Sequence, residues 1–410
     1  MKQKRDYPIA VVTPKGEKAL VGGHPWVYGE EIRSLVGAPE NGGLVDVVSA
    51  GGSYLGTGFY NSHSKITVRI LSRNANDRFD RAFWLRRLEY AVQYRRTVMP
   101  GDDFQCCRLI HGEADQLPGL TVDRYGELLV AQVLSLGMER IKPMLFEGLR
   151  RILNGQGERI ARLFERNDVG LREKEGLEQG KGWFPLEGAA LPASPVTEIV
   201  ENGVRYAVDV ENGQKTGFFL DQKYNRRAAA RLARGKRVLD CFTHTGSFGL
   251  NAAMGGAAHV TSVDISEEAV SMARENARRN RLEGVMDFRT ADVFDLLTQM
   301  AAEKRRDYDF IILDPPAFTK SRQTVRNAAR GYKEINLKAM KLLPRGGYLA
   351  TCSCSHFMTD ALFREMLRSA AADAAVSLRQ IEARQQAPDH PILWNVPETD
   401  YLKFYLFQVV

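Results

Sequence analysis

Four aspartates in the C-terminal half of the chain stand at or just after the ends of short apolar segments. They are Asp240, Asp264, Asp292 and Asp314. In an open parallel sheet the carboxyl ends of the strands lie along one edge, so acids placed there converge on one crevice. Carboxylates in such a crevice can accept hydrogen bonds from the hydroxyl and amino groups of a nucleoside. We therefore predict a nucleoside-containing ligand, with Asp264 at its ribose and Asp292 at its adenine edge.

The turn after Asp240 discriminates between two kinds of nucleoside cofactor. A nicotinamide cofactor needs a G-x-G-x-x-G turn for its pyrophosphate, whereas residues 241–249 read CFTHTGSFG and lack the first glycine. A turn with a single glycine at Gly246 suits a cofactor without phosphates. We predict S-adenosylmethionine, and a nicotinamide-dependent dehydrogenase is the weaker alternative.

An aspartate–proline–proline turn and two cysteines form a second group of reactive residues. Asp314 precedes Pro315 and Pro316, which stiffen the backbone, and Cys352 and Cys354 lie in the later segment TCSCSH. Carbon 5 of a pyrimidine is too weak a nucleophile to take a methyl group unless a thiolate first adds at carbon 6. We predict Cys354 as the nucleophile because it lies further out along its strand, with Cys352 as the alternative. Asp314 would then protonate N3 of the base.

The elements that must position these residues alternate between strand and helix after residue 235. The pattern predicts strands over 237–242, 259–264, 287–292, 308–314 and 347–353, and helices over 248–254 and 266–280. Ser266 is the expected N-cap of the second helix, since Glu267 and Glu268 in the first turn complement the helix dipole. The repeated strand–helix unit indicates an α/β fold with a parallel, doubly wound sheet.

The N-terminal half follows a different pattern. Short apolar runs between glycine-rich turns predict a small β-domain over 1–75, and residues 76–195 mix strand-like and helical segments in an α+β middle domain. The third domain then covers 196–410. Residues 77–97 predict a basic amphipathic helix. Its apolar face would carry Phe83, Leu85, Leu88 and Val92, with Arg81, Arg86, Arg87, Arg95 and Arg96 largely elsewhere.

Composition and charge exclude several classes of protein. With 44% hydrophobic and 26% charged residues, the 410-residue chain is globular rather than disordered or collagenous. It has no run of 18 apolar residues and no signal-peptide core, so we expect a cytoplasmic protein without membrane contact. Five cysteines without CxxC spacing predict neither a disulfide framework nor a metal site. The net charge is +7, and residues 1–100 hold 15 Lys/Arg against 9 Asp/Glu, which indicates a nucleic-acid partner.

Several motifs, taken in order, resemble the bacterial ribosomal RNA large subunit methyltransferase I family. They are LDCFTHTGSFGLNAA, SVDIS, ADVFD, ILDPPAFTKSR, TCSCSH and YLKFYLF. GEKALVGGHPWVYGEEI resembles the start of that family's PUA domain, a small RNA-binding β-barrel, and RLIHGEADQLPGLTVDRYGELLVAQ resembles its middle domain. The resemblance covers nearly the whole chain. It implies a C-terminal class I (Rossmann-like) methyltransferase domain that uses S-adenosylmethionine to form 5-methylcytosine in 23S ribosomal RNA.

The resemblance also implies which residues form the sites. The cofactor site would comprise Asp240, Gly246, Asp264, Asp292 and Asp314, with Gln214 and Phe218 near the methionine end, and we extend it to Phe242, Thr245, Ile265 and Val293. Cys354 is the implied catalytic thiol. Ala317 stands where better-known RNA cytosine methyltransferases carry a second cysteine, so another base must remove the C5 proton. The predicted RNA contacts are His24, Trp26, Arg81, Arg86, Arg87, Lys320 and Arg322.

Two other functions stay open at this point. An RNA methyltransferase that acts on an exocyclic amine or another base position would need no thiol. A non-catalytic RNA-binding protein of ribosome assembly could retain a Rossmann-like domain, although the intact series of acids argues against it. The sequence identifies neither the target nucleotide nor the oligomeric state, and a homodimer is one of the options.

Overall fold

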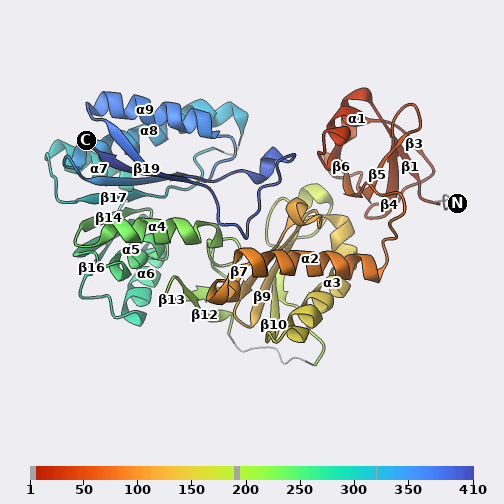
Figure 1. Ribbon diagram of the computed structural model, residues 1–410, viewed down its shortest axis with the longest axis horizontal. Coiled ribbons are helices and arrows are strands. Elements are labelled where there is room, and N and C mark those ends of the chain that lie inside the picture. The colour runs from red at the N-terminus through yellow and green to blue at the C-terminus, as the bar shows by residue number, and fades with distance from the viewer. Residues whose placement is uncertain (1–5, 189–193, 320) are drawn as a thin grey trace. The chain divides into compact units, whose positions relative to one another are not determined.

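The computed structural model describes residues 6–188, 194–319 and 321–410, which divide into two compact units (Figure 1). The first unit combines Met1–Ile199 with two later segments, Val208–Leu220 and Pro388–Thr399. The second unit comprises Val200–Ala207, Asp221–Ala387 and Asp400–Val410. The β12 strand (Val196–Glu201) and the β13 strand (Val204–Asp209) form a two-stranded sheet where the chain passes from one unit to the other.

The N-terminal part of the first unit is a six-stranded sheet with the order β2-β6-β5-β4-β1-β3. Its strands are β1 (Ile9–Val12), β2 (Trp26–Tyr28), β3 (Ile32–Val36), β4 (Leu44–Val48), β5 (Tyr54–Tyr60) and β6 (Ile66–Ser72). The α1 helix (Pro14–Val21) begins with a proline at its first turn and Thr13 as N-cap. Alternate strand residues such as Ala10, Val12, Val45 and Val47 point inward and form this part's core.

The second part of the first unit is a five-stranded sheet with the order β11-β10-β9-β8-β7. Its strands are β7 (Cys106–His111), β8 (Leu120–Tyr125), β9 (Leu128–Val133), β10 (Arg162–Arg166) and β11 (Lys181–Trp183), with the helices α2 (Arg81–Val98) and α3 (Leu136–Gly155). The two helices approach closely at Gly148, where a Cβ atom would lie 2.6 Å from Leu85 Cδ2. Asp80 accepts a hydrogen bond from the Phe83 amide at 2.9 Å and so caps the N-terminus of α2.

Two arginines of α2 are buried, contrary to the prediction that its arginines lie largely off the packed face. Arg87 is only 8% exposed, and its guanidinium donates to the backbone carbonyls of Leu71 and Gln116. Burial lowers the pKa of Arg87 to about 10. Arg95 is fully buried. A guanidinium carries five N–H donors, so carbonyl acceptors can compensate for its burial.

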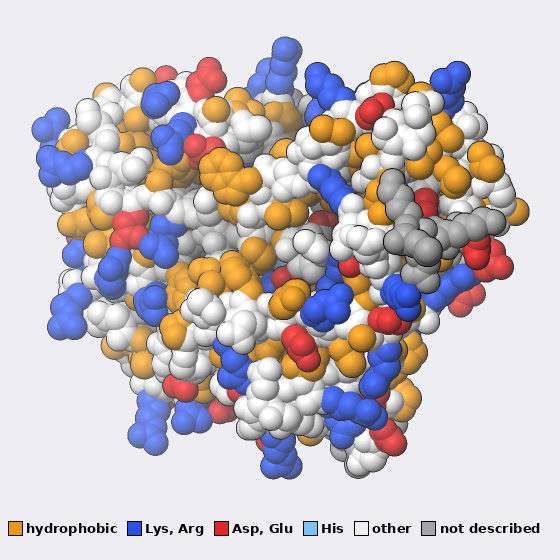
Figure 2. Space-filling model, turned by 45° about the vertical axis from the view of Figure 1, so that its right-hand side comes forward, with side chains coloured by type: hydrophobic (Ala, Val, Ile, Leu, Met, Phe, Trp, Pro, Cys, Tyr) orange, Lys and Arg blue, Asp and Glu red, His pale blue; other side chains and the backbone are white. Residues whose placement is uncertain are grey.

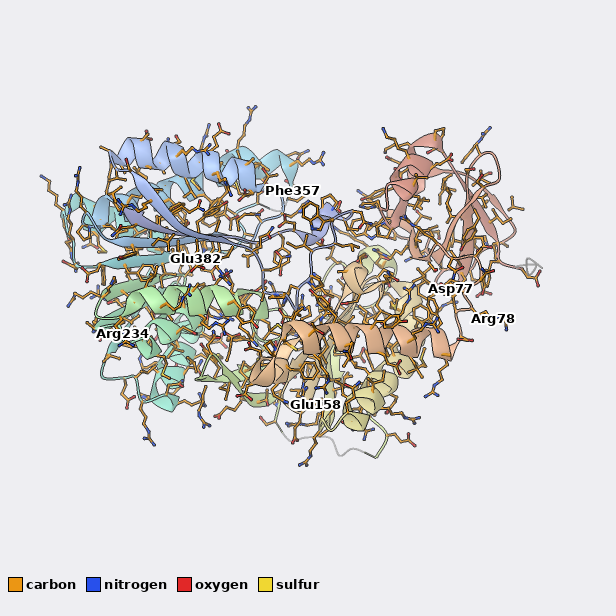
Figure 3. The ribbon with its side chains drawn as sticks, viewed as in Figure 1. Asp77, Arg78, Glu158, Arg234, Phe357 and Glu382 are labelled. Carbon is orange, nitrogen blue, oxygen red and sulfur yellow. The ribbon has the colours of Figure 1, made fainter. Side chains whose placement is uncertain are left out.

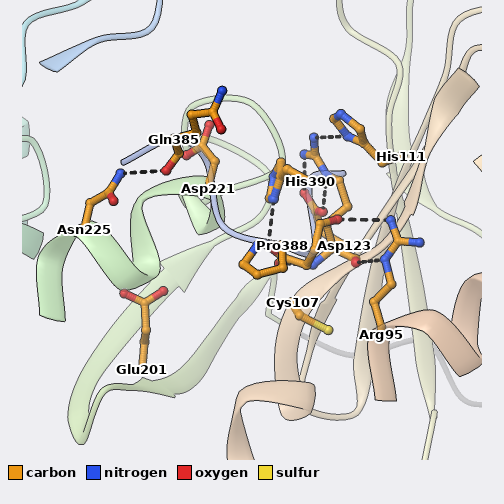
Figure 4. Close-up of polar contacts among 12 residues, drawn as sticks. Arg95, Cys107, His111, Asp123, Glu201, Asp221, Asn225, Gln385, Pro388 and His390 are labelled. Carbon is orange, nitrogen blue, oxygen red and sulfur yellow. Dashed lines mark hydrogen bonds and ion pairs between the residues drawn. The ribbon is translucent and has the colours of Figure 1, made fainter. Parts of the chain in front are cut away.

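Arg95 joins the segment Pro388–Thr399 to the rest of the first unit. It pairs with the Asp115 carboxylate and donates to the carbonyls of Arg108 at 2.9 Å and Asp389 at 3.0 Å (Figure 4). The Asp389 carboxylate in turn accepts from the Arg108 amide at 2.8 Å and lies 2.9 Å from His390 Nδ1. These contacts place residues 388–399, which the sequence assigns to the C-terminal domain, in the first unit.

The second unit contains a seven-stranded sheet with the order β16-β15-β14-β17-β18-β20-β19. Five strands are parallel: β14 (Arg237–Cys241), β15 (His259–Asp264), β16 (Met286–Thr290), β17 (Phe310–Leu313) and β18 (Tyr348–Ser353). Two more, β19 (Leu378–Arg384) and β20 (Lys403–Val409), add antiparallel pairs at one edge. The strand order reverses between β14 and β17, which is where open α/β sheets bind ligands. The predicted α/β doubly wound fold is confirmed.

Six helices of the described chain accompany this sheet. They are α4 (Lys223–Ala233), α5 (Ser247–Met254), α6 (Glu267–Arg279), α7 (Val293–Ala302), α8 (Val325–Leu342) and α9 (Asp360–Ala374). The Ser266 hydroxyl accepts from the Ala269 amide, as expected for the N-cap of α6. Leu297, Ile335, Met340 and Phe363 pack with the strand residues in one large core, which fixes the carboxyl ends of the strands relative to one another.

Removing the Arg95 guanidinium should destabilise the first unit strongly. Arg95→Met leaves the carboxylate of Asp115 buried without its counter-ion, so we expect a loss of about 3–5 kcal/mol in the free energy of unfolding. Urea denaturation of the variant and the wild type measures this loss. Arg86→Met on the exposed side of the same helix is the matched control, with an expected change within about 0.5 kcal/mol. Equal midpoints for the two variants would contradict the structural role of Arg95.

Candidate active site

The turn between β14 and α5 holds three residues in the left-handed backbone region. Phe242 has φ 63°, His244 φ 50° and Gly246 φ 85°, and only the last is a glycine. A left-handed conformation costs a non-glycine residue roughly 1–2 kcal/mol. Backbone hydrogen bonds maintain the turn: Thr243 N donates to Val263 O at 2.9 Å and Gly246 N to Thr243 O at 2.8 Å. Strain of this kind is characteristic of ligand-binding sites.

Asp240, at the end of β14, is completely buried beneath this turn. Its Oδ2 atom accepts from the Gly249 amide at 2.8 Å and from the Thr243 hydroxyl. Gly249 is required here because a Cβ atom would lie 2.4 Å from Ser262 Oγ and 2.8 Å from Asp240 Oδ2. Burial raises the pKa of Asp240 to about 7, and the nearby carboxylates of Asp314 and Asp264 raise it further against these hydrogen bonds. The carboxyl is therefore protonated in a large fraction of molecules at neutral pH.

Asp264 and Asp292 end the neighbouring strand segments with their carboxylates held by backbone amides. Asp264 accepts from His244 N at 2.8 Å and from Ser266 N at 3.1 Å. Asp292 caps α7 and accepts from Phe294 N at 2.7 Å. Both oxygens of Asp264 accept from an amide, whereas the amides at Asp292 bind only Oδ1, and both side chains are half-buried.

The remaining predicted cofactor residues differ in their exposure. Ile265, directly after Asp264, is 69% exposed and can pack against a flat ring. The side chain of Val293 is buried in the hydrophobic core, so only its backbone can reach a ligand. Phe242 packs partly against the same core. Gln214 is exposed and Phe218 is buried, and both belong to the first unit whereas the acids belong to the second, so their cofactor role stays a prediction.

Two buried polar atoms near the turn have no hydrogen-bond partner among the described residues. They are Asp240 Oδ1 and the Thr245 hydroxyl. An unpaired buried polar group costs about 1–3 kcal/mol, so a bound molecule that satisfies both atoms would be favoured. Together with the acids at the ends of β15 and β16, this set suits the amino-acid and nucleoside groups of S-adenosylmethionine. Residues 241–249 lack the first glycine of the G-x-G-x-x-G turn that binds a pyrophosphate.

Asp314, at the end of β17, lies beside Cys352 of β18 and Gln222. Gln222 Nε2 donates to Asp314 Oδ1 at 2.9 Å, and the Cys352 thiol hydrogen-bonds to the same carboxyl. Burial raises the pKa of Asp314 to about 6, the Asp221 carboxylate adds to the rise, and Arg226 opposes it. Burial also raises the pKa of the Cys352 thiol well above its usual value, and Asp314 adds to that effect. Cys352 is therefore a neutral thiol.

Cys354 is the one cysteine of the five that is not buried. It follows Ser353 at the end of β18, and its thiol interacts electrostatically with Cys352, Tyr332 and Lys403. The next residue, Ser355, donates its hydroxyl to Thr319 O at 2.8 Å and so ties this loop to the segment after the two prolines. The loop continues to Thr359 and includes His356 and Phe357, whose ring centroids lie 5.4 Å apart in an edge-to-face arrangement. Phe357 is labelled in Figure 3. The structure thus brings Asp314 and both cysteines to neighbouring strand ends.

The predicted RNA contacts fall into four groups. Arg81, Arg86 and Arg322 are exposed. His24 and Trp26 already make internal contacts, His24 with Glu398 and the Trp26 indole with Glu113 at 2.9 Å. The structure excludes Arg87 because its guanidinium is buried, and Lys320 lies outside the described residues. Figure 2 shows Lys and Arg side chains scattered over one face among acidic ones rather than gathered in one patch.

Gln222 and Lys403 are site residues that the sequence reasoning missed. Gln222 lies 92 positions from the Asp314 that it binds, and Lys403 lies 49 positions from Cys354. Lys403 occurs in YLKFYLF, a motif of the family resemblance, and Gln222 occurs in ENGQKTGFFLDQKYNRR, which resembles the segment that leads into that family's catalytic domain. These resemblances are the signal that could have identified both residues. Neither residue stands in a local pattern that would predict a role.

A cavity of about 670 Å³ lies at the opposite edge of the same sheet, away from the acids and the cysteines. Its lining includes Lys304, Arg305, Arg306, Lys341 and Arg345. The helices α7, α8 and α9 all end at this cavity. Cations at helix C-termini complement the partial negative charge of the helix dipole. We therefore regard these cations as dipole partners and assign the cavity no catalytic role.

Comparison with known proteins places the chain among methyltransferases. Residues 181–408 match a family model described as S-adenosylmethionine-dependent methyltransferase, and residues 10–73 match a PUA-like domain. The curated relatives include "Ribosomal RNA large subunit methyltransferase I" of Klebsiella pneumoniae (strain 342), 38% identical over 98% of this chain and 99% of the relative. The protein of that name from Escherichia coli O1:K1 / APEC is also 38% identical, over 98% of this chain and all of the relative.

Solved structures support the same fold over nearly the whole chain. A SAM-dependent methyltransferase structure from Streptococcus mutans has a TM-score of 0.80 at 22% identity and covers 98% of this chain and 100% of its own. A second methyltransferase, complexed with SAH, has a TM-score of 0.82 at 21% identity with the same coverage. The family resemblance, the N-terminal PUA-like domain and the predicted cofactor are confirmed by these matches taken together with the family model.

The described residues were also examined for the features of a membrane span and of a metal site. None of the described helices is both long and apolar enough to cross a bilayer. Within the described ranges, His, Cys, Asp and Glu side chains form no group of three or more that could hold a metal ion.

The raised pKa of Asp240 predicts a pH-dependent effect of Asp240→Asn on stability. Because burial raises this pKa from 3.8 to about 7 in the folded protein, the folded state retains a proton that the unfolded state releases above about pH 4. This contribution to stability is present at low pH and is lost as the pH rises to about 7. Asparagine keeps an oxygen for the Gly249 amide and does not titrate. The Tm of the Asp240→Asn variant should therefore rise relative to that of the wild type as the pH increases from 5 to 7.

Thermal melts of both proteins at several pH values measure this difference. Asp102→Asn, at an exposed position, is the matched control. A Tm difference for Asp240→Asn that stays constant across the range would show that Asp240 titrates normally.

Proposed function

The chain belongs to the S-adenosylmethionine-dependent methyltransferases of the ribosomal RNA large subunit methyltransferase I family, and we propose that it forms 5-methylcytosine in 23S ribosomal RNA through a covalent adduct of Cys354. The observation that carries the proposal is the half-buried Asp314 carboxyl, which hydrogen-bonds to Cys352 and lies at a strand end next to the strand that leads into Cys354. A carboxyl with a pKa of about 6 can both hold and release a proton near neutral pH. This property suits a group that protonates a base nitrogen.

The chemistry requires a cytosine that is out of its base stack. Unstacking costs a few kcal/mol, and the flipped base can then be recognised through its Watson–Crick edge. The Cys354 thiolate adds to carbon 6 and forms an S–C6 bond. Asp314 gives a proton to N3, so negative charge does not build up on the ring.

The methyl group is supplied by bound S-adenosylmethionine. The cofactor would donate this methyl group to carbon 5, whose electron pair the addition at carbon 6 makes available, and would leave as S-adenosylhomocysteine when its S–CH3 bond breaks. Removal of the C5 proton by a base then re-forms the C5–C6 double bond and expels the Cys354 thiolate, and N3 returns its proton to Asp314. The two cysteines thus have different roles, since Cys352 is a neutral, buried partner of Asp314 and Cys354 is the accessible nucleophile.

The adduct can be trapped with RNA that contains 5-fluorocytosine. Fluorine replaces the hydrogen at carbon 5, so no proton can be removed there and the S–C6 bond should persist. The result should be a protein–RNA species that survives denaturing electrophoresis. Cys354→Ser should abolish this species, and Cys352→Ala should retain it. Mass analysis of the nucleosides of undermodified 23S ribosomal RNA, methylated with labelled cofactor, should give 5-methylcytosine.

Other results would reassign the chemistry. An undiminished adduct with Cys354→Ser and none with Cys352→Ala would make Cys352 the nucleophile. Methylation that survives both substitutions would favour transfer to another position of the base. Cofactor binding without turnover on ribosomal RNA would favour a non-catalytic RNA-binding protein of ribosome assembly.

We also propose that the first unit holds RNA phosphates. Its PUA-like match and the exposed arginines of α2, Arg81 and Arg86, support this role. Each cation that neutralises a phosphate releases condensed counterions, which makes binding weaken with salt.

The double variant Arg81→Ala/Arg86→Ala should therefore bind RNA with a weaker salt dependence. If each arginine contacts one phosphate, the slope of log K against log salt should fall by about 1.4–1.8 in magnitude. Filter binding to 23S ribosomal RNA at several salt concentrations measures the slope. Arg151→Ala/Arg159→Ala, two exposed arginines of the same unit, is the control. An unchanged slope in the α2 variant would remove Arg81 and Arg86 from the interface.

A further inference from the structure

Lys403 is a buried lysine next to the proposed nucleophile. It is 5% exposed and is the first residue of β20, which runs antiparallel to β18. In that ladder Lys403 lies opposite Ser353, the residue that directly precedes Cys354. Lysine is almost never this buried without a compensating interaction, so its position needs a physical explanation.

The ammonium group of Lys403 is held by two backbone carbonyls. Nζ donates to Ser355 O at 2.6 Å and to Tyr401 O at 2.8 Å. Ser355 directly follows Cys354, so the ammonium is bound to the backbone of the residue next to the proposed nucleophile in the chain. Carbonyls satisfy two of the three ammonium protons but do not neutralise the charge. In the described part of the chain, no carboxylate lies within ion-pair distance of Nζ.

The groups that act electrostatically on Lys403 come from three neighbouring segments. They are Asp400 before β20, Cys354 after β18 and Asp360 at the start of α9. Asp360 already pairs with Arg364 at 2.8 Å. Burial lowers the pKa of Lys403 to about 8, and these three groups oppose the change. The amine is therefore able to exchange its proton near neutral pH.

Two other titratable groups that interact electrostatically with Cys354, the Tyr332 phenol and the Cys352 thiol, are uncharged near neutral pH. Burial raises the pKa of the Tyr332 phenol on α8, and burial together with Asp314 raises that of the Cys352 thiol. Neither group supplies a positive charge. Lys403 is thus the cation that faces Cys354 among these neighbours.

We propose that Lys403 is the positioning residue whose fixed positive charge holds Cys354 as a thiolate. The Sγ–H bond breaks and its proton is released to solvent, so an uncharged thiol becomes a thiolate in the field of the ammonium that Ser355 O and Tyr401 O hold. A fixed cation favours a thiolate, and more so where water is excluded. Its use in catalysis rests on the proposed addition of Cys354 to cytosine, whereas the ion pair itself does not need RNA.

The pH dependence of alkylation tests this pair directly. Because the other four cysteines are buried, iodoacetamide should modify Cys354 first, and peptide mass mapping confirms the site. In the wild type, the pH at which the alkylation rate reaches half its maximum should lie clearly below about 8.5, which is the pKa of a free cysteine. A wild-type midpoint at or above that value would overturn the proposal without any variant.

Two substitutions separate the charge of Lys403 from its hydrogen bonds. Lys403→Gln keeps amide donors for the carbonyls of Ser355 and Tyr401 but has no charge, so alkylation at pH 7 should slow by about tenfold as the midpoint rises by about one unit. Lys403→Arg keeps the charge and should lie closer to the wild type. Lys341→Gln, on the exposed surface of α8, is the control. A Lys403→Gln profile equal to the wild type, or a Lys403→Arg profile equal to that of Lys403→Gln, would refute the role of the charge.

The outcome separates this inference from the proposed function. A shifted alkylation profile together with no adduct on 5-fluorocytosine RNA would refute the cytosine chemistry and leave the Lys403–Cys354 pair standing. An RNA adduct together with an unshifted profile would refute the pair and leave the cytosine chemistry standing. If both hold, Lys403→Gln should lower kcat while the KM for S-adenosylmethionine stays the same.

Discussion

The burial of charged groups at one edge of the parallel sheet is the constraint on which the active site depends. Asp240 is fully buried and Asp314 is half-buried, and the Asp314 carboxylate raises the pKa of Asp240. Buried carboxyls are tolerated because backbone amides and neighbouring side chains supply hydrogen bonds, as Gly249 does for Asp240 and Gln222 for Asp314. The same environment raises the pKa of Asp314 to about 6, which is the property that the proposed proton transfer to N3 requires.

The cofactor turn and the cysteine loop follow from this arrangement. A turn with left-handed Phe242 and His244 stores strain, and it leaves the Thr245 hydroxyl and Asp240 Oδ1 without partners. A ligand that satisfies these atoms would recover part of that cost on binding. On the neighbouring strand, the Cys352 thiol hydrogen-bonds to Asp314, so in the proposed reaction Cys354 attacks the substrate and Lys403 stabilises its thiolate.

Buried charged residues also occur in the first unit, where they make a prediction from helical periodicity wrong. A helical pattern predicts that most arginines of α2 face away from the packed side. Arg87 and Arg95 instead lie inside and donate to carbonyls from distant segments, including that of Asp389. A guanidinium on a long side chain can be buried when enough acceptors surround it. The number of acceptors around a residue is a property of the fold and does not appear in the helical pattern.

The sequence by itself determined the alternation of strand and helix after residue 235, the acids at the strand ends and the family, because these features depend on residues close together along the chain. Only the tertiary structure decided that Gln222 binds Asp314, that β20 pairs with β18 and places Lys403 beside Cys354, and that residues 388–399 pack with the first unit. The reason is physical. Periodicity and turn chemistry describe local conformation, whereas burial and the hydrogen bonds between distant residues depend on which strands pair and in which register.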